Sequence, residues 1–109
     1  MTTLFMVRSN PKPGQETAFN DWYTDVHLTE VLSIQGFLSA QRFTLNEAQV
    51  QPDQTQSYLA IYEIDTDHVP ATLDQLRKAT WLNISDAIDP ASINISIFSA
   101  ITEKLAGSD

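Results

Sequence analysis

The spacing of apolar residues changes along the chain, and these changes predict the order of the secondary structure elements. Residues 3–9 form a short apolar run that ends at prolines and a glycine, which is typical of a strand. From Glu16 onward the period becomes 3.6 residues, which indicates an amphipathic helix. Its apolar face is predicted to consist of Phe19, Trp22, Tyr23 and Val26. His27 is expected at the edge of this face, beside Tyr23.

The apolar face of this helix becomes irregular at its C-terminal end. Glu30 would fall in the middle of the face if the helix ran straight. A bend near Leu28–Thr29 would remove the conflict, with Thr29 capping a second short turn that runs to Ile34. Glycine is a usual residue just after a helix C-terminus, so the helix is predicted to end at Gly36.

The remainder of the chain predicts three strands and a second helix. Strands are expected over residues 37–45, 58–64 and 93–105. Pro70 suits the first position of a helix that ends near residues 81–82. The connections at 46–56, 65–68 and 83–92 are polar or contain proline, and the tail 106–109 is expected to fray.

The order of these elements is βαββαβ, within a single domain over residues 1–109. It predicts an α+β fold of the ferredoxin-like type, with a four-stranded antiparallel sheet. Two helices cover only one face of such a sheet, so the other face should be polar if water covered it. Instead, segments 58–64 and 93–101 carry apolar residues on both faces. A second copy packed sheet to sheet, in a twofold homodimer, would bury the second face.

The composition argues against several classes of function. The net charge is −8, and the six cations are scattered, so neither nucleic acid nor an anionic membrane is an expected partner. The chain has no cysteine, which excludes disulfides and thiolate metal sites and fits a reducing compartment. The sequence shows neither a signal peptide nor the run of about 20 apolar residues that spans a membrane, so a cytoplasmic location is expected.

The segment from Phe19 to Phe43 resembles a known superfamily. It contains, in order, the runs FNDWYTDVHL, VL, IQGF and SAQRF. An aromatic pair, a histidine, an apolar turn, Gly-Phe and a strand with arginine in this order are similar to the dimeric α+β barrel superfamily, in particular to the EthD-like proteins of small-molecule catabolism. Members often carry proline at the position of Thr29. The specific match covers about a quarter of the chain.

This resemblance implies two βαββαβ units whose sheets close a barrel, with the helices outside. It also implies a site in each subunit, in the cleft between helices and sheet. It does not imply one activity, because the superfamily includes cofactor-free monooxygenases, lactone isomerases, haem-binding members and proteins with no known reaction.

His27 is the leading candidate for a catalytic residue. An imidazole at the border of an apolar face can act as a general acid or base near neutral pH. The resemblance strengthens this expectation, because the equivalent histidine often lines the pocket in the family. A histidine that only bonds a backbone carbonyl is the alternative. Tyr23 is expected to assist through its phenol, and Trp22 is a candidate ligand contact, although an aromatic pair at this spacing also serves simply to cover a sheet.

Arg42 is a further candidate for ligand binding. Alternation along strand 37–45 places it on one face with Leu38 and Ala40, opposite Phe37. A buried guanidinium needs a partner, which could be a substrate carboxylate or an internal acid. The internal pair, with Glu30 or Glu63, is the favoured interpretation.

Glu30 and Tyr62 complete the set of predicted site residues. Glu30 could orient the His27 ring or point to water. Tyr62 could line the pocket or the dimer seam. Asp65, Asp67 and His68 do not match the spacing of a standard metal site, and there is no glycine-rich phosphate loop, so neither a metal nor a cofactor is expected.

Together these features predict a cofactor-independent enzyme of small-molecule catabolism, isomerase-like or monooxygenase-like. Its chemistry would be acid/base catalysis by His27 on a small aromatic or lactone-like compound. The alternative is a non-catalytic dimeric protein that binds ligands or responds to stress. A haem-binding relative is a weaker third interpretation.

Overall fold

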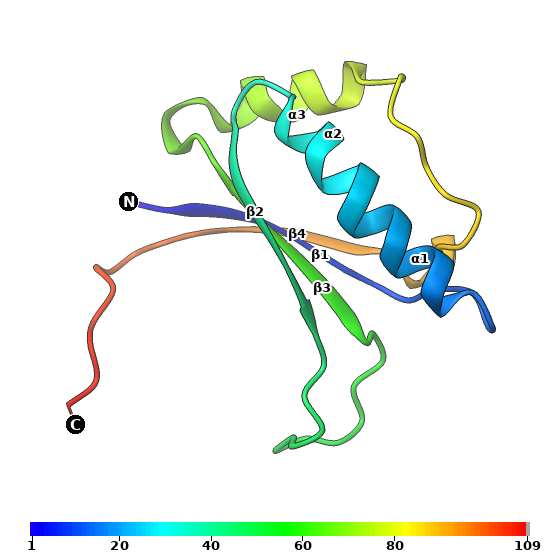
Figure 1. The fold of residues 1–109 in the computed structure, drawn as a ribbon. Coiled ribbons are helices and arrows are strands. Elements are labelled where there is room, and N and C mark those ends of the chain that lie inside the picture. The colour runs from blue at the N-terminus through cyan, green and yellow to red at the C-terminus, as the bar shows by residue number, and fades with distance from the viewer. Residues whose placement is uncertain (109) are drawn as a thin grey trace.

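A computed structural model describes residues 1–108 and confirms the predicted βαββαβ order (Figure 1). The elements are β1 (Thr3–Ser9), α1 (Glu16–Trp22), η1 (Tyr23–His27), α2 (Leu28–Leu32), β2 (Phe37–Thr44), β3 (Tyr58–Ile64), η2 (Thr66–His68), α3 (Val69–Lys78), η3 (Pro90–Ser92) and β4 (Asn94–Ser99). The strands form one antiparallel sheet in the order β2-β3-β1-β4. This is the ferredoxin-like α+β arrangement.

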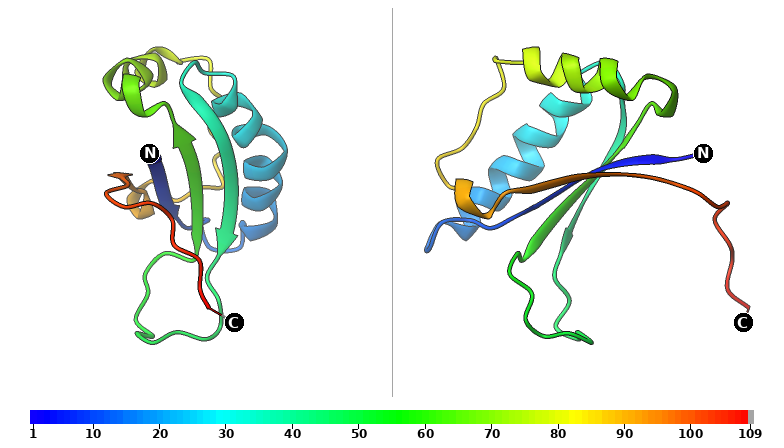
Figure 2. Two further views of the ribbon diagram at one scale, coloured as in Figure 1. Left: turned by 90° about the vertical axis from the view of Figure 1, so that its left-hand side faces the viewer. Right: turned by 180° about the vertical axis from the view of Figure 1, so that it is seen from behind.

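The helices all lie on one side of the sheet, and the other side carries no layer of secondary structure (Figures 1 and 2). The core therefore forms between the helices and one sheet face. Phe5, Tyr62 and Phe37 pack there edge to face, with ring centroids 5.6 to 6.0 Å apart. Phe19 of α1 is fully buried and packs edge-on against Tyr23, at 5.5 Å. Phe19 also packs on the Tyr58 ring of β3, with centroids 5.3 Å apart, and this contact fixes the long helix to the sheet.

A π-helical turn, rather than a bend, resolves the irregular apolar face of the first helix. The helix continues from Glu16 to Leu32, and its turn at Tyr23–His27 closes with a bond from the Leu28 N–H to the Tyr23 carbonyl. The expectation that Thr29 caps a second turn is wrong, because helical backbone continues through that position. The extra residue rotates the following face, so that Val31 is buried while Val26 remains 37% exposed.

A register shift at the start of β2 changes the predicted alternation. The shift lies between Phe37 and Ser39, so Phe37 is buried in the core on the same side as Ala40 and Arg42. Leu38, expected on that side, is instead 62% exposed. A β-bulge of this kind re-aims side chains, and simple alternation does not predict it.

Two elements end earlier than the sequence indicates. The edge strand β4 stops at Ser99 rather than Leu105, because its only partner, β1, begins at Thr3, opposite Ser99. A last bond from the Ala100 N–H to the Thr2 carbonyl follows. The helix α3 ends at Lys78 rather than near residues 81–82. The segment 79–89 then crosses to the other end of the sheet (Figure 1).

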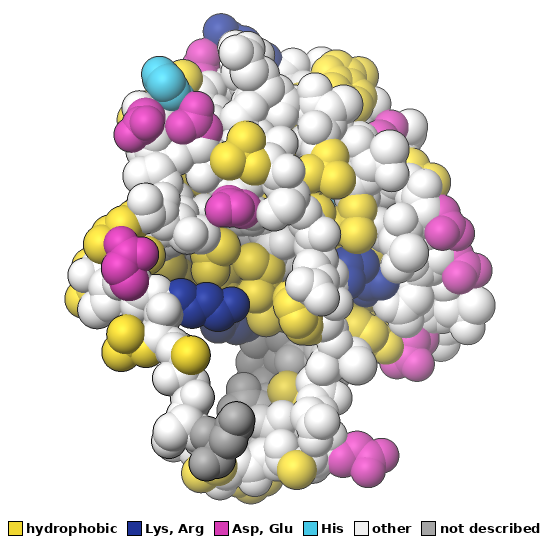
Figure 3. Space-filling model, turned by 60° about the vertical axis from the view of Figure 1, so that its left-hand side comes forward, with side chains coloured by type: hydrophobic (Ala, Val, Ile, Leu, Met, Phe, Trp, Pro, Cys, Tyr) yellow, Lys and Arg dark blue, Asp and Glu magenta, His cyan; other side chains and the backbone are white. Residues whose placement is uncertain are grey.

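The uncovered sheet face, called the open face below, carries apolar residues, as predicted, but they are mixed with polar ones such as Arg8, Gln41 and Glu63. Strand register places on it the apolar residues Leu4, Met6, Phe43, Leu59, Ile61 and Phe98. Figure 3 shows hydrophobic side chains gathered on the side of the molecule that this face occupies. Among the described residues, no helix is both long enough and apolar enough to cross a membrane.

Gly36 provides a test of this architecture. Its φ of +103° is a left-handed conformation, and a Cβ there would lie 2.7 Å from Cγ2 of Thr72 on α3. Replacement by alanine should lower the free energy of unfolding by about 2–4 kcal/mol, from backbone strain plus the clash. Gly14→Ala is the matched control: φ is +78°, with no atom within 4 Å, so it should cost about 1–2 kcal/mol. Equal losses in urea unfolding would contradict the close packing of Thr72 on Gly36.

Candidate functional site

A cavity of about 210 Å³ lies between the first helix, the covered face of the sheet and segment 79–89. Its walls are mainly aliphatic and aromatic, including Val7, Val31, Leu76, Ile88 and Ile95. Larger hollows, of about 260 and 430 Å³, lie beside the β2–β3 loop and are lined mostly by its polar residues. The apolar cavity is the candidate site, because most of the predicted site residues border it.

Four predicted site residues line this cavity: Trp22, Tyr23, His27 and Tyr62. The first three come from the π-helical turn and the residue before it. A π turn bonds residue i to i+5, so His27 lies one turn beyond both aromatic residues. The imidazole stacks on the Trp22 indole, with centroids 4.6 Å apart, and meets the Tyr23 ring edge to face at 5.0 Å. The turn thus moves His27 from the edge of the helix face to the wall of the cavity.

Two polar atoms at this wall have no hydrogen-bond partner within residues 1–108. They are Nδ1 of His27 and the hydroxyl of Tyr62, and both are buried. Buried polar atoms in proteins are nearly always paired, so an unpaired one needs an explanation. Binding of a ligand is one such explanation, and both residues border the same cavity.

The His27 imidazole is neutral at physiological pH. Burial lowers its pKa from the usual value of 6.5 to about 4, because desolvation penalises the charged ring, and the nearby Glu30 carboxylate only partly opposes this. A neutral imidazole can accept a proton but has none to give as an imidazolium acid. The site therefore presents a base, rather than an acid, at position 27.

The two tyrosines keep their protons. Burial raises the pKa of Tyr62 strongly, and the neighbouring Tyr23 raises it further. Burial also raises the pKa of Tyr23, against the opposing effects of the Tyr62 hydroxyl and the Arg42 cation. The two hydroxyls are close enough to influence each other, but the Tyr62 hydroxyl makes no hydrogen bond that meets normal geometry. Each is thus a neutral group that can donate a hydrogen bond.

Glu30 does not line the cavity; it holds one of the cavity walls. Its carboxylate accepts hydrogen bonds from the backbone N–H of Asn83, at 3.0 Å, and from the Asn83 side-chain amide, at 2.9 Å. The Trp22 indole N–H donates to the Asn83 carbonyl at 2.7 Å. Segment 79–89, which supplies Ile88 to the cavity, is thereby attached to the helix. The sequence predicted the end of a helix near residues 81–82 and then a loop, and nothing in its pattern indicated these contacts.

Arg42 also lies outside the cavity lining, and its predicted ion pair with Glu30 or Glu63 is wrong. Its guanidinium donates to the side chains of Asn20, at 2.8 Å, and Thr24, at 2.9 Å. It also lies over the Tyr23 ring, 4.6 Å from the centroid. A guanidinium on an aromatic face with neutral acceptors needs no carboxylate. Tyr23 is therefore shared, lining the cavity and supporting this cation.

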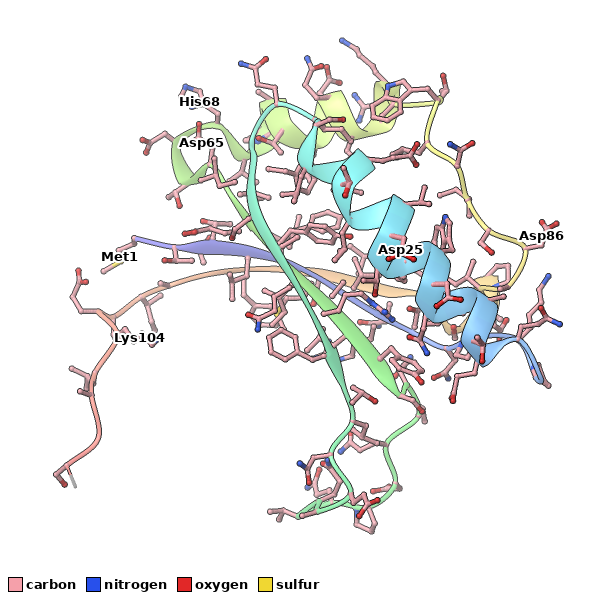
Figure 4. The ribbon with its side chains drawn as sticks, viewed as in Figure 1. Met1, Asp25, Asp65, His68, Asp86 and Lys104 are labelled. Carbon is pink, nitrogen blue, oxygen red and sulfur yellow. The ribbon has the colours of Figure 1, made fainter. Side chains whose placement is uncertain are left out.

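The acidic residues near the second histidine form no metal site. Asp65 and His68 bond at 2.8 Å in the exposed turn before α3 (Figure 4). In the part of the chain that the structure describes, no three acidic or histidine side chains are arranged to hold a metal ion.

Comparison with solved structures confirms the ferredoxin-like, EthD-like fold. An ethyl tert-butyl ether D (EthD) family protein from Bacillus halodurans C-125 matches with a TM-score of 0.58 and 14% identity, over 93% of this chain and 100% of that one. A putative monooxygenase from Shewanella loihica PV-4 gives 0.54 and 12%, over 94% and 98% of the two chains. A protein of unknown function from Nitrosomonas europaea gives 0.56 and 19%, over 98% and 96%. No protein-family model and no curated protein sequence matches the chain.

The low pKa of His27 predicts a pH-dependent stability. An unfolded histidine titrates near about 6.5, so between this pH and about 4 the unfolded state binds the extra proton. Stability should therefore fall as the pH is lowered through that window, by up to about 3 kcal/mol. His27→Asn removes the titrating ring, and its urea unfolding should lack this contribution. Identical pH slopes for wild type and His27→Asn would contradict a buried, neutral imidazole.

Proposed function

We propose that this protein binds a small apolar or aromatic compound in the cavity and that His27 removes a proton from it without a cofactor. The observation that carries the proposal is the buried Nδ1 atom of a neutral imidazole, unpaired by the described residues, at the wall of an apolar cavity. Proton abstraction next to a carbonyl, as in an isomerisation, or from a hydroxyl, as a first step of oxidation, suits this arrangement. Arg42 has no part in it, because it does not line the cavity.

The two tyrosines provide the complementary half of the chemistry. When the imidazole takes a proton, negative charge develops on the ligand oxygen. Hydroxyl groups that keep their protons, such as those of Tyr62 and Tyr23, can donate hydrogen bonds to that oxygen. The apolar surroundings strengthen the attraction between the imidazolium and the new anion. A positioned base contributes about 10²–10⁴-fold to a rate when its pKa lies near the operating pH, and the low pKa of His27 makes its imidazole a weaker base than that.

The similarity to an EthD family protein and a putative monooxygenase supports a role in small-molecule catabolism and names no reaction for this chain. A non-catalytic ligand-binding protein is the second candidate. The observation that favours it is the packing of the imidazole between Trp22 and Tyr23, which would hold a purely structural histidine equally well.

We also propose that the working form is a cytoplasmic homodimer. The open face exposes Phe43 at 40% and Phe98 at 58%, and the described helices all lie on the other side of the sheet. Exposed apolar surface of this extent marks an interaction site, and the same surface on a second copy is a self-complementary partner. The lack of cysteine fits the reducing compartment.

Hydrogen–deuterium exchange tests the proposed base. Wild-type protein in D₂O at pH 7 should accelerate exchange at the carbon next to the carbonyl of a small single-ring lactone, 5-methylfuran-2(3H)-one, by at least about 10²-fold over buffer. Proton NMR follows the loss of the signal. His27→Asn should remove the acceleration, and His68→Asn, at the exposed second histidine, should retain it. If His27→Asn exchanges the lactone as fast as wild type, His27 is not the base. If wild type binds the lactone and does not accelerate its exchange, the protein is a binding protein instead.

Sedimentation tests the homodimer. Phe98→Asp places a charge on the proposed interface, at an exposed position of the edge strand, and should convert the protein to monomers at micromolar concentration. Val26→Asp, at an exposed apolar position on the helix layer, is the matched control and should leave the dimer intact. A wild-type protein that sediments as a monomer would exclude the proposal.

A further inference from the structure

The cavity contains no charged side chain. None of its lining residues is Lys, Arg, Asp or Glu. Arg42 is held outside it by Asn20 and Thr24. Arg77 and Lys78 pair with Asp74 at the exposed end of α3. A ligand in the cavity therefore meets no cation.

The polar groups that the cavity offers are also uncharged. The imidazole of His27 is neutral, and the Tyr62 hydroxyl keeps its proton, as derived above. An anionic ligand would lose its hydration without gaining a countercharge, which is unfavourable in an apolar environment. A neutral ligand carries no such penalty.

The two unpaired atoms specify the kind of polar group that fits. Nδ1 of a neutral imidazole is a donor or an acceptor according to its tautomer, and a tyrosine hydroxyl is both. A ligand hydroxyl can donate and accept, so it satisfies either atom in either tautomer once side chains at the cavity wall move aside, since both atoms are buried in this structure. Tyr62 is 1% exposed, so its hydroxyl has no alternative partner in bulk water. A ligand without a polar group would leave both atoms unpaired.

The volume of the cavity suits a ligand of one ring. An engineered apolar cavity of about 150 Å³ accommodates benzene. The volume of about 210 Å³ leaves space for one or two small substituents on such a ring.

We propose that the cavity selects uncharged single-ring compounds that carry a hydroxyl, of which a phenol is the simplest, and rejects the carboxylate of the same ring. This inference rests on the proposed function, since it takes the cavity to be the ligand site. It adds a rule of ligand selection to that function. Tyr62 and His27 select for a hydroxyl, and the absence of a cation from the cavity lining selects against a carboxylate.

Three matched probes test the inference by isothermal titration calorimetry at pH 7.5: p-cresol, toluene and p-toluate. They share one methyl-substituted ring and differ in having a hydroxyl, no polar group or a carboxylate. We expect p-cresol to bind at least 10-fold more tightly than toluene and at least 100-fold more tightly than p-toluate. Tyr62→Phe should lower the affinity for p-cresol about 10-fold and leave the affinity for toluene unchanged. Unchanged toluene binding would also show that the variant is folded.

Tyr58→Phe is the matched control variant. The Tyr58 hydroxyl accepts a bond from Asn20 at 3.2 Å and does not border the cavity, so p-cresol affinity should stay within about twofold. Binding of p-toluate as tight as that of p-cresol, or an unchanged p-cresol affinity in Tyr62→Phe, would overturn the selection rule while the cavity remains a ligand site. If none of the probes binds and the lactone does not exchange, both the rule and the proposed function fail.

Discussion

The hydrogen bond from the Leu28 N–H to the Tyr23 carbonyl closes a turn that holds one residue more than an α-helical turn. That added residue determines how the rest of the first helix faces the sheet. It brings His27 against Trp22 and Tyr23, and it buries Val31 in the core. It also turns Glu30 sideways, toward Asn83. The base, the cavity and the attachment of the cavity wall therefore share one local change in helical pitch.

Charge is distributed so that the interior stays neutral in a strongly acidic chain. The net charge is −8, yet the cavity is lined only by apolar residues, tyrosines, a tryptophan and a neutral histidine. Arg42, the cation nearest to this core, is held by an amide, a hydroxyl and aromatic faces. Its partners are therefore neutral groups rather than carboxylates. Burial dominates the pKa of His27, and the one nearby carboxylate that opposes it, Glu30, bonds to Asn83.

Periodicity in the sequence predicted the features that depend on local order. The element sequence, the covered helix face and the position of His27 near Tyr23 follow from residues close together in the chain. Features that depend on distant partners were not predictable. The length of β4 follows from where β1 begins, 96 residues earlier in the Thr3–Ser99 pair. The contacts of Glu30 and Trp22 join them to Asn83 across 53 and 61 residues of chain. The predicted ion pair of Arg42 with Glu30 or Glu63 was wrong, because an amide, a hydroxyl and an aromatic ring stabilise the guanidinium in place of a carboxylate.

Trp22 touches both the base and the wall, since its ring stacks on His27 while its N–H holds the carbonyl of Asn83. Displacing segment 79–89 would admit water to the His27 imidazole and so raise its pKa toward the usual value. Linkage then requires the reverse effect, in which a proton on the ring loosens the segment by the same free energy. The protonation state of His27 and the position of segment 79–89 are therefore coupled. The Trp22 indole, which contacts both, provides the coupling.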